Sequence, residues 1–388
     1  MADRIYLDHN ATTPLDPRVL EAMRPYLESL FGNPSSVEHA DGHAAAIAVT
    51  KARAQVASAI GAREAEIVFT GGCTEANNMA ILGAARANPT KRHLITTAIE
   101  HPSVLEPMRA LEREGWRVTF LPVDDEGMIT ADAVRDAITE ETALVSVMGA
   151  NNEVGALQPL TEIGAICAER DVLFHADLAQ AAAYAPLDVE RDRIHLASLS
   201  AHKAYGPKGV GALYVRSRRP RAKITPLVFG GGQERGLRPG TLNTAGIVGM
   251  GAAFDLAART ATFEASRLAA MCEAFLVAVS EALPAVKLNG PRSNRLANNL
   301  SLSIDGIEPL ALMRRLGDRL SFSASSACSS DKIETSPVLL AMFGDTARAR
   351  QAFRIAPGRF TTEDQMRYAA TLICEEARRL LGLASAAV

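Results

Sequence analysis

Short apolar segments alternate with amphipathic ones between about residues 45 and 215. The apolar segments predict strands over residues 66–70, 93–97, 117–121, 143–148, 172–174, 194–199 and 210–215. The amphipathic segments predict helices over residues 74–87, 102–114 and 159–170. Strand–helix alternation of this length indicates a mostly parallel sheet that is covered by helices on both faces. We therefore expect an α/β fold.

The pattern changes after the three glycines at residues 230–232. A long helix is expected over residues 244–283, ended by Pro284. Strands over 299–304 and 353–355 and helices over 309–316 and 362–381 complete the chain. This mixture is typical of an α+β unit. We expect a large domain over residues 14–258 and a smaller one formed by residues 1–13 and 259–388. The pattern alone leaves open whether the opening segment packs on the small domain.

Composition limits the possible functions. A chain of 388 residues is long enough for two domains, and 48% hydrophobic with 22% charged residues is typical of a globular protein. The net charge of -3 gives no electrostatic reason to expect nucleic acid or a membrane as a partner. No apolar run approaches the roughly 20 residues that span a bilayer, and the first residues do not resemble a secretory signal. We therefore expect a cytoplasmic protein.

The five cysteines are scattered, and none belongs to a CxxC pair. This spacing argues against a disulfide framework and a zinc site, so we expect no metal, and any functional cysteine should act as a thiol. Cys328 lies among small polar residues, 323–330, and is expected to be exposed; whether it is reactive or incidental stays open from the residues alone. Three others lie in predicted helices and are expected to pack in the core: Cys167, Cys272 and Cys374.

Two polar clusters follow predicted strands of the sheet. Residues 175–180 follow the strand over 172–174, and residues 200–203 follow the strand over 194–199. Ligands of open α/β sheets bind beyond the carboxyl ends of the strands. Burial lowers the pKa of a lysine, so Lys203 would be a good amine for a Schiff base. Asp177 could pair with the pyridine nitrogen of pyridoxal phosphate (PLP). The alternative is a buried ion pair between Lys203 and Asp177.

A glycine-containing turn over residues 70–75 follows a strand and begins a helix. Its glycines would let the backbone approach a phosphate, and a helix N-terminus attracts anions. Cys73 lies in this turn, and its role is ambiguous. The turn could equally be an ordinary helix cap, and it matches neither the dinucleotide fingerprint GxGxxG nor the phosphate loop GxxxxGK.

Taken together, these segments resemble the cysteine desulfurases of nitrogenase and iron–sulfur cluster assembly, within the class V aminotransferase family. The resemblance extends over nearly the whole chain. The matching segments are residues 6–14 (YLDHNATTP), 31–36 (FGNPSS), 100–102 (EHP), 151–155 (NNEVG), 201–209 (AHKAYGPKG), 238–241 (RPGT), 326–329 (SACS) and 354–360 (RIAPGRF). It implies the PLP-dependent transferase fold of type I, with a seven-stranded sheet in the large domain, and a homodimer.

The resemblance implies a role for each matching residue around the cofactor. Lys203 would be bonded to PLP and would later shuttle protons. His101 would stack on the pyridine ring and assist acid–base steps. Asp177 would face the ring nitrogen, and Gln180 the phenolic oxygen. The phosphate would be held by residues of both subunits: Thr74 beside Cys73, Ser200, His202, and Thr241 of the partner subunit.

The resemblance also implies a substrate and a reaction. The substrate carboxylate would be bound by Asn152 and Arg354, with Asn33 nearby. Cys328 would receive the sulfur on a loop over residues 321–337, which resembles the family branch with an extended catalytic loop. The reaction would convert L-cysteine to L-alanine and leave a persulfide on Cys328. That sulfur would pass to an acceptor or cluster scaffold protein, for iron–sulfur assembly or thiolation.

Two alternatives remain open. The first is a selenocysteine lyase or an aminotransferase of the same fold, and the second is a non-catalytic sulfur-relay or regulatory protein. Two features depart from the family pattern. Cys73 replaces the alanine usual before the phosphate-binding threonine, and residues 323–328 (SASSAC) lack the glycine of the usual SSGSAC form. We expect the loss of that glycine to stiffen the loop.

Overall fold

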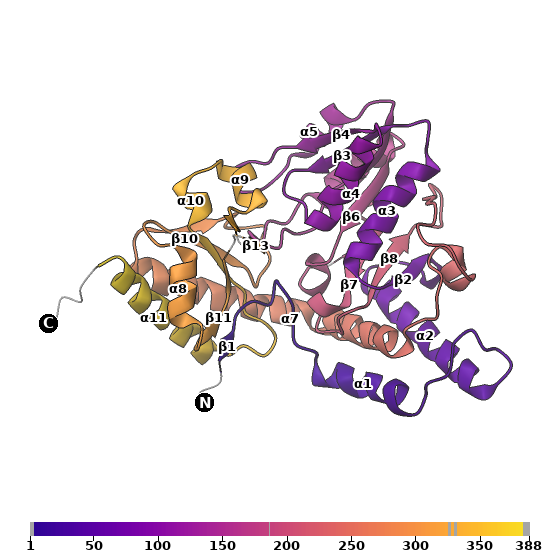
Figure 1. The fold of residues 1–388 in the computed structure, drawn as a ribbon, viewed down its shortest axis with the longest axis horizontal. Helices are drawn as coiled ribbons and strands as arrows, with labels where there is room; N and C mark the ends of the chain where they lie inside the picture. Colours follow the sequence, from indigo (N-terminus) through magenta and orange to yellow (C-terminus); the bar gives the residue numbers. More distant parts are fainter. Residues whose placement is uncertain (1–3, 186, 325–326, 330–331, 383–388) are drawn as a thin grey trace.

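The computed structural model describes residues 4–185, 187–324, 327–329 and 332–382, with the backbone alone for 327–329 and 332–334. Its largest element is a seven-stranded sheet (Figure 1). The strands lie in the order β2 (Ile67–Thr70), β8 (Gly211–Val215), β7 (Leu196–Ser200), β6 (Leu173–Asp177), β5 (Thr142–Ser146), β3 (His93–Thr97) and β4 (Arg117–Leu121). β8 is antiparallel to both neighbours, and the other adjacent pairs are parallel. The predicted mostly parallel seven-stranded sheet is confirmed.

Helices cover both faces of this sheet because its central strands are apolar on both sides. Successive residues of a strand point to opposite faces. Leu144 of β5 therefore belongs to one core cluster and Val145 to the other, and Leu196 and Ala197 of β7 divide in the same way. The helices of the first cluster are α3 (Cys73–Ala87) and α4 (Pro102–Arg113). Those of the second are α2 (Ala40–Ala59), α6 (Leu160–Glu169) and the first part of α7 (Thr244–Ala282).

The C-terminal part of the chain forms an antiparallel sheet with a hydrophobic core of its own. Its strands lie in the order β12 (Ser323–Ala324), β15 (Ala352–Ile355), β10 (Leu300–Ile304) and β9 (Val286–Asn289). The helices α8 (Pro309–Leu316) and α11 (Glu363–Leu380), the second part of α7, and Ile5 and Leu7 of the opening segment also contribute to this core. Two short helices, α9 (Pro337–Phe343) and α10 (Ala347–Arg350), pack with Ile99 and Met148 from the other part of the molecule.

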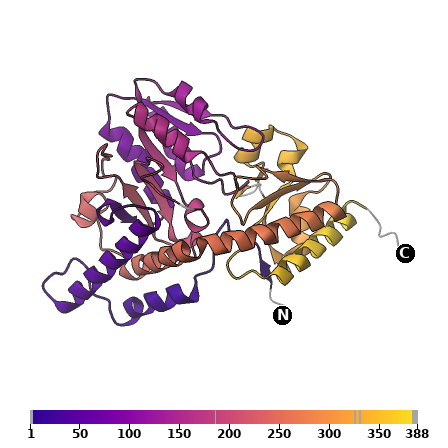
Figure 2. The same cartoon turned by 180° about the vertical axis from the view of Figure 1, so that it is seen from behind.

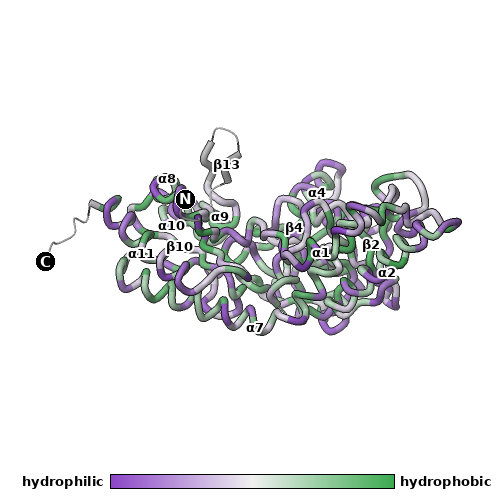
Figure 3. The backbone as a smooth tube through the Cα atoms, turned by 90° about the horizontal axis from the view of Figure 1, so that it is seen from below, coloured by the Kyte–Doolittle hydropathy of each residue, from purple (hydrophilic) through white to green (hydrophobic). Residues whose placement is uncertain are grey.

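Two segments tie the two parts together. α7 contributes Ile247 to the core of the large sheet and Phe275 to the core of the small one, and Figure 2 shows it running across both parts in the foreground. The opening segment returns to the small sheet's side, where β1 (Ile5–Tyr6) pairs in parallel with β11 (Leu320–Ser321). Seen from below, the molecule is elongated, with α11 at one end and α2 at the other (Figure 3). The boundaries of the two domains stay a prediction.

Several elements differ from the prediction. β6 continues through Asp177, so residues 175–177 end the strand rather than follow it. The polar ring of His175 is tolerated inside the sheet because the hydroxyls of Ser146 and Ser198 bond to it from the two neighbouring strands. The Ser-rich stretch contains a hairpin, β13 (Ala327–Ser329) paired with β14 (Lys332–Glu334).

The helices before β2 are absent from the prediction. They are α1 (Pro17–Glu28) and α2, and the short α5 (Ala131–Ala137) is missing in the same way. α2 is rich in alanine, which is a strong helix former. Alanines spread along the whole helix do not give the sequence a distinct apolar face, so the helical period is not visible. No helix in the described ranges is long and apolar enough to cross a membrane.

Candidate cofactor and substrate site

A cavity of about 970 Å3 lies at the carboxyl ends of β6 and β7 and reaches the N-terminus of α3. Ten of the predicted site residues line it. They are Cys73, Thr74, His101, Asn152, Asp177, Gln180, Ser200, His202, Lys203 and Arg354. The structure therefore brings together residues from the carboxyl ends of five strands of the large sheet, as the topology of an open α/β sheet requires, and Arg354 from the small sheet. Within the described ranges, no group of three or more His, Cys, Asp and Glu side chains could hold a metal ion.

Lys203 follows β7 in a short 3-10 turn, Ala201–Lys203. Its amine donates to the carbonyl oxygens of Asn10 and Ala11, the latter at 2.8 Å. Burial, reinforced by the positive charge of Arg354, lowers the pKa of Lys203 to about 8. In the part of the chain that the structure describes, no carboxylate lies within salt-bridge distance of this amine. The alternative of a buried ion pair with Asp177 is therefore wrong.

Asp177 ends β6 and is held by three donors. Asn77 Nδ2 donates to Oδ2 at 2.7 Å, and the backbone N–H of Ala179 donates to Oδ1 at 2.9 Å. The thiol of Cys73 donates to the same Oδ1 at 3.5 Å. With 6% of its surface exposed, the carboxylate is buried yet oriented into the cavity. A carboxylate fixed in this way is suited to pair with a cationic ring nitrogen.

His101 is the N-cap of α4, so its position is set by the start of a helix. Its Nδ1 accepts from the backbone N–H of Ser103 at 3.1 Å and lies 2.7 Å from the hydroxyl of the same residue. Burial lowers the pKa of His101. A neutral ring whose Nδ1 accepts carries its proton on Nε2. His101 can therefore donate one hydrogen bond into the cavity.

The other end of the cavity offers donors for an anion. Gly72, the N-cap of α3, has φ of 155°, which favours glycine, and the N–H groups of a helix's first turn lack partners inside the helix. The buried hydroxyl of Ser200 has no hydrogen-bond partner among the described residues. His202 bonds to the hydroxyl of Thr12 through Nδ1 at 3.1 Å, and burial lowers its pKa to about 4. These groups fit a phosphate.

The donor set as a whole fits PLP. An amine with a lowered pKa, a buried carboxylate and an orphaned hydroxyl beside a helix N-terminus match the aldehyde, ring nitrogen and phosphate of that cofactor. Gln180 lies between them and the opening segment, because its Nε2 donates to the carbonyl of Asn10 at 2.8 Å. The residues that would hold PLP therefore converge from separate segments.

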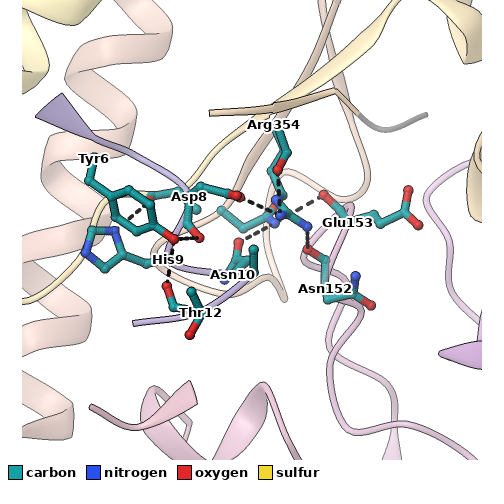
Figure 4. Close-up of polar contacts among 12 residues, drawn as sticks. Tyr6, Asp8, His9, Asn10, Thr12, Asn152, Glu153 and Arg354 are labelled. Atoms are coloured by element: carbon teal, nitrogen blue, oxygen red, sulfur yellow. Dashed lines mark hydrogen bonds and ion pairs between the residues drawn. The ribbon is translucent and has the colours of Figure 1, made fainter. Parts of the chain in front are cut away.

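Arg354 lies on β15, on the side of the cavity that the small sheet forms. Its Nη1 donates to the backbone carbonyl of Asn152 at 2.7 Å, and its Nη2 donates to Asp8 at 2.7 Å and to Ser323 Oγ at 3.3 Å. Figure 4 shows Asp8 and Asn152 on either side of the guanidinium. A buried guanidinium that lines a cavity is suited to bind a carboxylate.

Two of the predicted site residues, Thr241 and Asn33, do not line this cavity, and a third is described by its backbone alone. Thr241 is exposed between β8 and α7. Asn33 is exposed between α1 and α2, where its Oδ1 accepts from the N–H of Ser35 at 3.0 Å. Cys328 lies in β13 opposite Ile333, and its side chain is outside the described residues. The roles assigned to these three stay predictions.

The prediction assigned no role to four residues that the structure places at the site. They are Asp8, Asn10, Thr12 and Asn77. Three of them belong to the matching segment over residues 6–14, so that segment was the available signal. Asn77 follows Cys73 by four residues on α3, which puts both on one face of the helix. Its contact with Asp177 follows from that spacing once α3 is placed beside β6.

Comparison with known proteins agrees with this geometry. The family model described as aminotransferase class-V matches residues 5–364. A cysteine desulfurase IscS of Rickettsia bellii (strain OSU 85-389) is 47% identical over 380 residues, which is 98% of this chain and 92% of that protein. A cysteine desulfurase IscS of Rickettsia felis (strain ATCC VR-1525 / URRWXCal2) is 47% identical over 377 residues, covering 97% of this chain and 92% of that protein.

Solved structures are similar over nearly their whole length. A NifS-like protein is 36% identical with a TM-score of 0.90, covering 97% of this chain and all (100%) of that one. A structure described as SspA in complex with cysteine is 36% identical with a TM-score of 0.81, covering 92% of this chain and 100% of that one. On the family match, these identities and the cavity geometry together, the chain belongs to the aminotransferase class-V family.

Proposed function

We propose that this protein is a PLP-dependent cysteine desulfurase, which converts L-cysteine to L-alanine and transfers the sulfur to Cys328. The observation that carries the proposal is the Lys203 amine, buried without a carboxylate partner in the described ranges, in a cavity that also holds Asp177 and Arg354. A lysine whose pKa is lowered to about 8 is partly neutral near pH 7 and can act as a nucleophile. The IscS relatives and the cysteine-bound neighbour support the choice of substrate.

Several residues of the cavity would each have a task in this reaction. PLP, when bound, accepts an amine at its aldehyde and withdraws electrons from the substrate into its ring. Lys203, Asp177, Gln180, Thr74, Ser200 and His202 would hold it. With its amine free, Lys203 would take the proton from Cα of the substrate. His101, neutral with a proton on Nε2, can donate to a group in the cavity.

Sulfur transfer then requires a thiolate. The Cys328 thiolate would attack the substrate sulfur, so that an S–S bond forms while the C–S bond breaks. The electron pair of the C–S bond stays with the substrate carbon, which takes up a proton and leaves as alanine. Ser323 of β12 is paired in register with Arg354. The chain that leads from β12 to Cys328 therefore begins beside the proposed carboxylate site.

We further propose a homodimer in which Thr241 reaches the phosphate site of the partner. Large apolar side chains are exposed on two segments: Leu27, Phe31, Val37 and Ile47 on one, and Val228 and Phe229 on the other. Phe31 and Phe229 are more than four-fifths exposed, at 84% and 83%, which is unusual for phenylalanine unless a partner covers it. A cytoplasmic location and delivery to a sulfur acceptor or scaffold protein belong to the same proposal, because the reaction needs reduced thiols.

The test is incubation of the PLP-loaded protein with L-cysteine and a reductant, with sulfide and alanine measured separately. We expect equal amounts of both, and we expect Cys328→Ser to abolish sulfide release. The matched control is Cys167→Ser, which changes a buried cysteine of α6 that does not line the cavity. Alanine without sulfide, or full sulfide release by the Cys328 variant, would contradict the proposal. Transamination that survives in that variant would favour an aminotransferase.

A further inference from the structure

The guanidinium of Arg354 is fixed by three segments that are far apart in the sequence. Asn152 follows β5, Ser323 belongs to β12, and Asp8 follows β1. Asn152 contributes a carbonyl oxygen and Ser323 a hydroxyl, so Asp8 is the one charged partner of Arg354 among the described residues. Arg354 is 7% exposed, and a charge-assisted hydrogen bond is roughly twice as strong as a neutral one. Asp8 is therefore the strongest of the three contacts.

Asp8 is itself held in place by its backbone. It forms an isolated bridge with Ala356, next to β15. Leu7, the residue before it, is fully buried at 0% exposure. The hydroxyl of Tyr6 donates to the carbonyl of Asp8 at 3.1 Å and to that of Thr12 at 3.0 Å, and so closes the turn that follows (Figure 4). The backbone that carries the Asp8 carboxylate is thus held in place beside Arg354.

Arg354 keeps donors free for a ligand. A guanidinium has five N–H groups, and three take part in the contacts above. Its Nε is buried and has no partner among the described residues. Because Nε is buried, the second N–H group of Nη1 is the donor left for a carboxylate in the cavity that Arg354 lines. The bond to Asp8 orients the plane of the guanidinium and thereby the direction of the donors that remain.

We propose that Asp8 is a positioning residue for the α-carboxylate of the amino-acid substrate, acting through its bond to Nη2 of Arg354. The inference rests on the proposed function and deepens it, because it names the group that aims the substrate-binding arginine. Without Asp8 the long Arg354 side chain regains rotamer freedom, which substrate binding must then remove. The consequence is specific: recognition of the carboxylate weakens, while recognition of the amine and the thiol does not.

Two variants and two probe ligands test this. Asp8→Ala removes the acceptor, and Asp8→Asn keeps an oxygen in its place without the charge. 3-Mercaptopropionate has the carboxylate and thiol of cysteine without the amine, and cysteamine has the amine and thiol without the carboxylate. We expect Asp8→Ala to raise KM for L-cysteine and the calorimetric Kd of 3-mercaptopropionate roughly tenfold, the cost of one charged hydrogen bond. We expect kcat to change less than about threefold, an unchanged Kd for cysteamine, and Asp8→Asn, which keeps the oxygen but loses the charge, to fall between wild type and Asp8→Ala.

Each contrary result has a distinct meaning. An unchanged KM in Asp8→Ala overturns the inference, and a lowered KM overturns it by showing that repulsion between two carboxylates dominates. Equal weakening of both probe ligands would show a general structural role instead.

Glu273→Ala, which removes an exposed ion pair with Arg292, is the control for loss of a surface charge. Asp8→Ser, with a side chain one bond shorter, replaces Asp8→Ala if that variant does not fold. A wild-type protein that binds both probes but releases no sulfide refutes the proposed function alone.

Discussion

Charges of both signs act on the pKa of Lys203, and burial of its amine decides the direction of the shift. Burial is the largest cause of its lowered pKa, and Arg354 acts in the same direction. Asp177, Cys73 and Asp8 act in the opposite direction. Cys73 does so weakly, since burial and the nearby Asp177 raise the pKa of its own thiol well above the ordinary value. The ambiguity over Cys73 is thereby reduced: its protonated thiol is a donor to Asp177 and a poor nucleophile.

The rate at which the PLP-free protein takes up PLP should rise with pH around a midpoint near 8. The neutral amine is the reactive form, and the pKa of Lys203 is about 8 instead of 10.5. Below that pH the amine is protonated, so uptake slows. Arg354→Gln removes a positive charge that lowers this pKa, so its midpoint should move to higher pH.

Absorbance after addition of PLP measures this uptake. The Lys203→Ala variant is the control, because any absorbance change that it shows comes from reaction of PLP with surface lysines. A midpoint close to that of an ordinary lysine would contradict the burial of this amine, and an unmoved midpoint in Arg354→Gln would contradict its charge coupling.

At the scale of elements, the start of α9 is bonded to the substrate side of the cavity. Ser336 is the buried N-cap of α9, and its hydroxyl accepts from the N–H groups of Val338 at 3.1 Å and Leu339 at 3.4 Å. The same hydroxyl donates to Glu153, whose pKa is raised by burial. Glu153 directly follows Asn152, so one hydroxyl joins the end of the β13–β14 segment to the substrate side of the cavity.

Ser336→Ala should lower the free energy of local opening of α9 by about 1–2 kcal/mol, because an N-cap is lost and a buried acceptor on Glu153 loses its donor. Hydrogen–deuterium exchange of the peptide that contains Val338 and Leu339 measures this opening. Ser266→Ala is the matched control, since Ser266 is an exposed serine in the middle of α7. Exchange of the α9 peptide as slow as in wild type would refute the coupling.

At the scale of the whole molecule, exposed apolar groups contrast with well-buried cores. α7 contributes side chains to the core of each sheet, and the large side chains of these two cores are almost fully buried. Phe229 stands out because 83% of it is exposed on the segment that precedes Thr241. A surface of this kind is explained by a partner that covers it.

Phe229→Asp should weaken the proposed dimer by about 30-fold or more in Kd, the cost expected for a central aromatic contact of roughly 2 kcal/mol. Light scattering over a dilution series measures the shift towards monomer. Because Thr241 is proposed to reach the site of the partner, PLP should also dissociate faster from the diluted variant. Tyr368→Asp, on exposed α11, is the control. A wild-type monomer at every concentration would end the dimer proposal.

The periodic elements could be predicted because their patterns are local. The strand predicted over 93–97 and the helix predicted over 309–316 agree with β3 and α8 at both ends. A strand or helix that is buried on one side places apolar residues at a period of 2 or 3.6, and this spacing can be seen in the segment itself. The end of β6 was predicted three residues too early, because polar residues inside a sheet are tolerated only when neighbouring strands supply partners. That information lies in Ser146 and Ser198, outside the segment itself.

The sequence by itself determined that Lys203 and Asp177 lie at the carboxyl ends of buried strands of one mostly parallel sheet, and hence that they share a crevice. It also determined, through specific segments, the family whose cofactor fits there. Only the tertiary structure decided that Asp8 meets Arg354 across 346 residues of chain. The physical reason is that this contact depends on the pairing of β1 with β11 and on the bridge of Asp8 to Ala356. Pairing between segments that are distant in the sequence produces no periodic pattern of residues in either segment.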